Sequence, residues 1–199
     1  MSRKDIVVIG SKGSGFTHIT QIMAKVMAEE GYELVGRIQP QSGGAVGRKL
    51  LIPPFLGTGE EKFSIATTER TEGAETLIMI DPVGRPAYSI QEMTEGGCAI
   101  IDTSSPISKY WLNDVKDEAK KKKIRLVLVD TNEAMKDIED IPKVRNMFLF
   151  GMAVSLSLPS INEETISKVL LESYGDFGEK LFKTVKAGIE YGRKIGEKC

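Results

Sequence analysis

The feature that most constrains the fold is a buried-strand pattern that passes directly into a glycine-rich loop. Ile6-Val7-Val8-Ile9 is a continuous run of apolar, β-branched residues, which is typical of a strand covered on both faces of a parallel sheet. Gly10-Ser11-Lys12-Gly13-Ser14-Gly15 follows at once, and apolar residues then recur at helical spacing from Phe16 until Gly31. This order of strand, loop and helix predicts an α/β fold with a site at the loop.

Further apolar segments predict the rest of a mainly parallel sheet. They are Glu33–Ile38, Phe63–Thr68, Thr76–Ile80, Cys98–Ile101 and Ile124–Val129. The segment from Gln39 to Gly59 holds many glycines and prolines, so we expect it to be an irregular excursion, either functional or merely a surface loop. Because strands with apolar residues on both faces need cover on both sides, the predicted fold is a three-layer α/β/α, Rossmann-like sandwich.

The C-terminal part of the sequence is predicted to be helical. The expected helices are Leu112–Lys123, Met147–Leu158, Glu163–Ser173 after Asn162 as N-cap, and Lys180–Ile195. In the last of these, Gly188 and Gly192 lie on one face and leave room for close packing of another helix. No repeat or linker divides the sequence, so residues 1–199 are expected to form one domain.

Charge and cysteine content exclude several classes of function. The chain has 27 basic and 28 acidic residues among 199, which gives no electrostatic reason to expect nucleic acid or a membrane as partner. Only Cys98 and Cys199 are present, too few for a disulfide framework, a cysteine-ligated metal site or an iron–sulfur cluster. No segment resembles a signal peptide or a membrane span, so the expected location is the cytoplasm.

The glycine-rich loop is a candidate anion site because backbone N–H groups and the helix dipole both point toward a ligand there. The candidate binding residues are Gly10, Lys12, Gly13, Ser14, Gly15, Phe16 and Thr17. Lys12 occupies the middle glycine position of a dinucleotide fingerprint and no carboxylate ends the second strand, which disfavours NAD. Arg37 could instead meet a 2′-phosphate and keeps an NADP-binding protein open as an alternative, and tight packing alone is another.

No catalytic constellation is identifiable from spacing. His18 is the lone histidine, and we expect it to be a surface residue rather than a catalyst. Asp81 and Asp102 each follow an apolar strand, a position where α/β sites gather but where turn and cap chemistry places the same residues. The sequence therefore predicts no catalytic residue and no metal ligand in this chain.

Taken together, the sequence resembles the gamma subunit of 2-oxoacid:ferredoxin oxidoreductases, and the resemblance spans nearly the whole chain. Its carriers are Val8–Gly15 with the following helix, Glu30-Gly31-Tyr32, Ser42-Gly43-Gly44, Ile100–Ser104 and Val144–Gly151. Family members usually read Gly-x-Gly-Gly-Gln-Gly in the first loop and Arg-Gly-Gly in the second. Here Lys12, Ser14 and Ser42 replace a glycine, the glutamine and the arginine.

The resemblance implies a subunit of an enzyme that oxidatively decarboxylates a 2-oxoacid to acyl-CoA and passes electrons to ferredoxin. Thiamine diphosphate, Mg²⁺ and iron–sulfur clusters would be held by alpha, beta and, where present, delta subunits. This chain alone would bind no cofactor, be inactive by itself, and contribute assembly and a CoA-facing surface that includes Ser42, Gly43 and Gly44. A diverged interaction protein without enzymatic role is the remaining alternative.

Overall fold

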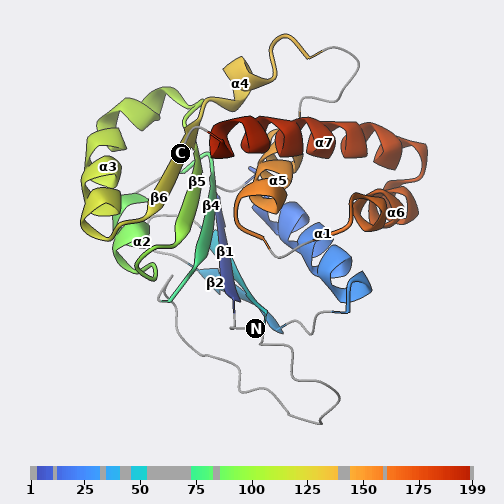
Figure 1. The fold of residues 1–199 in the computed structure, drawn as a ribbon, viewed down its shortest axis with the longest axis horizontal. Helices are drawn as coiled ribbons and strands as arrows, with labels where there is room; N and C mark the ends of the chain where they lie inside the picture. The colour runs from blue at the N-terminus through green and yellow to red at the C-terminus, as the bar shows by residue number, and fades with distance from the viewer. Residues whose placement is uncertain are drawn as a thin grey trace.

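The computed structural model describes residues 4–10, 13–31, 35–40, 46–52, 73–82, 86–138, 144–158 and 161–197, and its strands form one sheet with helices on both sides (Figure 1). The strands are β1 Lys4–Gly10, β2 Val35–Pro40, β3 Val46–Ile52, β4 Thr76–Ile80, β5 Cys98–Asp102 and β6 Arg125–Val129. The helices are α1 Phe16–Glu29, α2 Pro86–Gln91, α3 Leu112–Lys121, α4 Thr131–Ala134, α5 Arg145–Leu156, α6 Glu163–Tyr174 and α7 Asp176–Gly196, with a 3₁₀-helix at Pro106–Tyr110.

The sheet confirms the mainly parallel, three-layer prediction. Within the described residues its strand order is β2-β3-β1-β4-β5-β6, and β1, β4, β5 and β6 are parallel to one another. The chain runs from β1 toward the β2 edge but returns to the other side of β1 with β4. The strand order therefore reverses between β1 and β4, which is where open α/β sheets place their ligands.

The prediction of an irregular segment at 39–59 is wrong for its middle part. Val46–Ile52 forms β3, which lies between β2 and β1 and is antiparallel to both. The glycines and prolines on either side dominated the sequence pattern, whereas pairing with two neighbouring strands supplies the hydrogen bonds that make this stretch regular. The predicted strand at Phe63–Thr68 lies outside the described residues.

The two faces of the sheet bury alternate residues of each strand, as the period of a β-strand requires. Ile6, Val8 and Ile78 pack against α1, α5, α6 and α7, while Val7, Ile9 and other residues of alternate register pack under α2 and α3. Figure 1 shows these two helical layers on opposite sides of the sheet. No helix in the described ranges is both long and apolar enough to span a lipid bilayer.

Helix α5 is held close to α7 by glycines in both helices. A Cβ at Gly188 would clash with the carbonyl oxygen of Phe148, and one at Gly192 would lie 3.2 Å from the Cα of Met152. The predicted role of Gly188 and Gly192 in close packing is therefore confirmed. This contact fixes α5 over the sheet with its first residue, Arg145, at the carboxyl end of the parallel strands.

Candidate functional site

The glycine-rich loop turns sharply from β1 into α1. Gly15 is the N-cap of α1 with a φ of 79°, and Gly13 has a φ of 91°, in the left-handed region that glycine enters at little cost. Gly10 is tightly enclosed, because a Cβ there would lie 3.0 Å from Cβ of Phe16 and 3.1 Å from the carbonyl oxygen of Ile80. The loop therefore requires glycine both for its backbone angles and for its close approach to β4.

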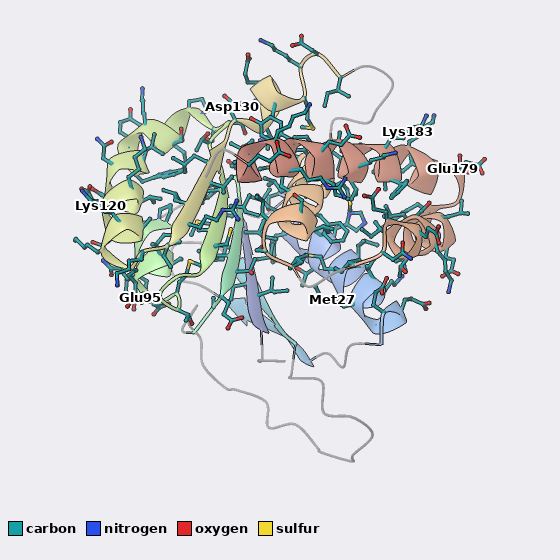
Figure 2. The ribbon with its side chains drawn as sticks, viewed as in Figure 1. Met27, Glu95, Lys120, Asp130, Glu179 and Lys183 are labelled. Atoms are coloured by element: carbon teal, nitrogen blue, oxygen red, sulfur yellow. The ribbon has the colours of Figure 1, made fainter. Side chains whose placement is uncertain are left out.

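The loop forms one wall of a cleft of about 450 Å³ at the carboxyl ends of β1 and β4. Its lining residues are Gly13, Ser14, Gly15, Ile80, Asp81, Val144, Arg145 and Asn146. In Figure 2 the carboxyl ends of the parallel strands lie on the side of the label Asp130, the residue that follows β6. The label Glu95 lies at the opposite end of the sheet. The cleft thus lies at the point where the strand order reverses, the expected ligand position in such sheets.

The opposite wall is the N-terminus of α5, which is bound directly to the loop. The buried amide of Asn146 donates from Nδ2 to the carbonyl oxygen of Gly15 at 3.1 Å and accepts at Oδ1 from the backbone N–H of Met147 at 3.0 Å. The N-termini of α1 and α5 therefore both border the cleft. Each brings the positive end of a helix dipole, which favours an anion, although in α5 the N–H of Met147 is already bonded to Asn146 and Val144 and the acidic Asp81 also lines the cleft.

A buried carboxylate lies beside this wall. Asp102 is fully buried at the end of β5, and its Oδ1 accepts from the backbone N–H of Ser104 at 3.0 Å and from the hydroxyl of Thr131 at 3.0 Å. Its Oδ2 lies 3.7 Å from Nη1 of Arg145. The same Nη1 donates to Oγ of Ser104 at 3.1 Å. The strand end predicted as a possible site thus supports the arginine that lines the cleft.

The expectation of a surface histidine holds only in part, because His18 is half-buried. The His18 ring lies edge-on to Tyr174 of α6, with ring centroids 5.2 Å apart, and its Nε2 is hydrogen-bonded to the Tyr174 hydroxyl. Partial burial lowers the pKa of His18 and raises the pKa of Tyr174. His18 therefore joins α1 to α6, and it is not among the residues that line the cleft.

The predicted binding residues occupy different positions. Gly13, Ser14 and Gly15 line the cleft. Gly10 is the last residue of β1 and is not among the lining residues. Phe16 is buried in the core, so its backbone rather than its side chain is available to a ligand. Thr17 is in the first turn of α1. Lys12, Ser42, Gly43 and Gly44 lie outside the described residues.

Sequence reasoning did not assign a binding role to the wall formed by Val144, Arg145 and Asn146. These residues stand at the start of an apolar helical run and carry no ligand motif of their own. The sequence signal that could have identified them is the Val144–Gly151 segment, one of the segments that carry the resemblance to the gamma subunits. Asp81 was noted only as a strand-end residue, and it too lines the cleft, with a φ of 49°.

Comparison with known proteins places nearly the whole chain in one family. Residues 5–193 match the model of the pyruvate ferredoxin/flavodoxin oxidoreductase family. No curated protein is a significant match to the chain. The region matched by the family model contains both walls of the cleft.

Solved structures share the fold at low sequence identity. A pyruvate oxidoreductase subunit, PORC, from Thermotoga maritima is 16% identical with a TM-score of 0.65, and the match covers 96% of this chain and 97% of that one. The gamma subunit of a keto/oxoacid ferredoxin oxidoreductase from Geobacter sulfurreducens is 16% identical with a TM-score of 0.62, over 96% and 99% of the two chains. A 2-oxoglutarate:ferredoxin oxidoreductase from Magnetococcus marinus is 14% identical with a TM-score of 0.66, over 100% of this chain and 32% of that longer one.

Proposed function

The chain belongs to the pyruvate ferredoxin/flavodoxin oxidoreductase family, and we propose that it is the gamma subunit of a multi-subunit 2-oxoacid:ferredoxin oxidoreductase. The observation that carries this proposal is the end-to-end match to separate subunits, 97% and 99% of whose length is covered. The corresponding match in the longer Magnetococcus marinus protein covers only 32% of that chain. A chain that corresponds to one part of a larger enzyme needs the other parts to act.

In this proposal the chemical steps belong to partner subunits. The alpha, beta and, where present, delta chains hold thiamine diphosphate with Mg²⁺ and the iron–sulfur clusters, and they pass electrons to ferredoxin. With two cysteines in its sequence, the gamma chain lacks the thiolates that a cluster requires. It contributes assembly in the cytoplasm, as one domain over residues 1–199, and the surface that receives CoA.

The cleft supports the assignment of CoA as ligand because its chemistry suits phosphate groups. One wall carries the N-terminus of α1, and the other carries the N-terminus of α5 with the exposed guanidinium of Arg145. Gly13 has no atom within 4 Å of the place where a Cβ would stand. The backbone can therefore approach a phosphate closely. We propose that Lys12, Thr17 and the Ser42-Gly43-Gly44 turn add to this surface.

Native purification tests the assignment to a complex. The full-length chain carrying a tag is purified from its own cells at low salt, and the proteins that accompany it are identified. We expect a thiamine-diphosphate subunit and an iron–sulfur subunit in fixed ratio, with 2-oxoacid-dependent reduction of ferredoxin that requires CoA. If the chain is recovered without either subunit while related complexes survive the same procedure, the proposed function is wrong.

The CoA surface is tested in the assembled complex with Gly13→Val. Valine at a φ of 91° is strained, and its branched side chain would occupy the space that a phosphate would approach. We expect calorimetry to show weaker CoA binding and turnover to require more CoA. Gly31→Val is the matched control, since Gly31 also has a positive φ of 84° with open space around it but ends α1 away from the loop. Equal effects of the two variants would assign the loop to packing, and tighter binding of NADPH than of CoA would favour the alternative of a nicotinamide-binding protein.

A further inference from the structure

A second pocket, of about 330 Å³, lies at the amino ends of the parallel strands, at the opposite end of the sheet from the cleft. Its lining includes Glu75 just before β4, Cys98 at the start of β5 and Arg125 at the start of β6. Leu156, the last residue of α5, lines it too. The label Glu95 in Figure 2 marks this end of the sheet. The pocket therefore offers a ligand side chains of both charges.

Arg125 brings a positive charge to this pocket, and its hydrogen bonds are incomplete. Its Nη1 donates to the carbonyl oxygen of Leu156 at 3.5 Å, a long hydrogen bond. Its Nε is buried and has no hydrogen-bond partner among the described residues, and no acidic side chain in the described ranges forms an ion pair with the guanidinium. A buried N–H group without an acceptor is costly. The edge formed by Nε and Nη2 therefore lacks an acceptor, and a carboxylate is the group that such a planar edge binds through two parallel hydrogen bonds.

Glu75 brings the opposite charge to the same pocket. The residue is half-buried, and its carboxylate forms no hydrogen bond or ion pair within the described part of the chain. Glu95, the other acidic residue of the lining, is already paired with Lys123 at 2.6 Å. Arg125 and Glu75 thus line one pocket without pairing with each other. Each charge is therefore open to the opposite charge of a ligand.

We propose that this pocket binds a free amino acid, with its carboxylate on Arg125 and its ammonium group on Glu75. A phosphate would be attracted by Arg125 but repelled by the acidic side chains and by the negative end of the α5 dipole at Leu156. A simple cation would be repelled by the guanidinium. A molecule that carries both charges satisfies both residues at once and adds no net charge to the site. The pocket is separate from the cleft, so this inference goes beyond the proposed function and does not depend on it.

Nuclear magnetic resonance of the full-length chain tests the proposal at the Nε–H group itself. The Nε–H signal of Arg125 is assigned by its loss in Arg125→Lys, and the standard amino acids are titrated one at a time at constant ionic strength. We expect at least one of them to shift this signal in a saturable way, with a Kd on the order of 1 mM or tighter.

Analogues with one charge decide whether both ends of the amino acid are recognised. The corresponding carboxylic acid without the amino group, and the corresponding amine without the carboxylate, should each bind at least about tenfold more weakly, because each loses one charge-assisted contact. If no amino acid shifts the Nε–H signal, or if the acid or the amine binds as tightly as the amino acid, the proposal is wrong.

Variants of the two charged residues assign the contacts. By calorimetry, Arg125→Gln and Glu75→Gln are each expected to weaken binding of the same amino acid about tenfold. Arg193→Gln and Glu163→Gln are the matched controls, because these residues form a surface pair between α7 and α6, with Nη2 3.0 Å from Oε1, and should leave the affinity unchanged. If thermal unfolding shows that Arg125→Gln does not fold, Arg125→Lys takes its place, since it keeps the charge but loses the planar fork, and it should bind severalfold more weakly. Wild-type affinity in the Arg125 variant or in Glu75→Gln would overturn the proposal.

Discussion

Gly188→Ala is expected to destabilise the protein although alanine is the better helix former. Gly188 faces α5 from within α7, and an added Cβ would clash with the carbonyl oxygen of Phe148 and lie 3.0 Å from its carbonyl carbon and 3.2 Å from Cα of Gly151. These neighbours are backbone atoms, which cannot rotate away as a side chain would. The added methyl group must therefore push the two helices apart.

The magnitude follows from two opposing effects. Replacing glycine by alanine in a helix gains about 1 kcal/mol of intrinsic stability, whereas inserting a methyl group into a well-packed contact costs typically about 1–3 kcal/mol. Because the clash involves backbone and separates the buried residues Val185 and Ile189 from α5, we place the cost at the upper end. The net loss in unfolding free energy is then about 2 kcal/mol, or roughly 4–8 °C in Tm for a chain of this size.

Urea titration and thermal unfolding of the full-length chain test this estimate, and Gly196→Ala is the control. Gly196 ends the same helix, and a Cβ there would meet only Nη2 of Arg125 at 3.4 Å and Cδ2 of Leu156 at 3.7 Å, which is ordinary contact. The control should match wild type or exceed it slightly. A Gly188→Ala protein as stable as the control would refute the reasoning that backbone contact between α5 and α7 requires glycine.

Three further predictions follow from the described contacts. Gly15→Ala should lower both stability and CoA affinity, because its φ is 79° and a Cβ would lie 3.3 Å from Cγ of Asn146; thermal unfolding and calorimetry measure the two losses, and normal values for both would contradict the role given to the contact between Gly15 and Asn146. Asn162→Ala should lower the unfolding free energy by about 1 kcal/mol, since its Oδ1 caps α6 by accepting from Glu164 N–H at 2.9 Å; urea titration measures this, and no loss would mean that the cap is dispensable. Burial lowers the pKa of His18, so as pH falls below about 6.5 the unfolded chain binds the proton first and stability decreases until the folded chain is protonated too; His18→Gln should remove that part of the pH dependence, and identical pH profiles would contradict it.

The strands that could be predicted are those whose apolar composition alone indicates that they are buried. Continuous apolar runs such as Ile6–Ile9 and Thr76–Ile80 are buried on both faces wherever they pair, so their composition alone indicates a central strand. Val46–Ile52 is different, because its regularity depends on two partners, β2 and β1, at long sequence distance. A window rich in glycine and proline gives no sign of such partners.

The site was predictable on one side only. The loop from Gly10 to Gly15 can be predicted from the spacing of its glycines after a strand, because that spacing reflects local backbone requirements. The second wall arises from α5, more than 120 residues later, and reaches the loop through the hydrogen bond from Asn146 to Gly15. The amphipathic or apolar pattern of a helix predicts which face is buried but not which strand end its N-terminus will meet.

The altered loop residues affect the anion-binding character of the cleft less than their number implies. Ser14 replaces the family's glutamine, yet its Oγ is buried and stands against Gly10 at the base of the loop, so the hydroxyl does not define the ligand surface. The proposed ligand surface consists of main-chain N–H groups at two helix N-termini, which no side-chain replacement removes. A charged side chain comes instead from Arg145, held by a carboxylate at the end of another strand. We therefore expect the proposed phosphate site to tolerate changes of individual loop residues as long as the backbone path and the α5 contact are kept.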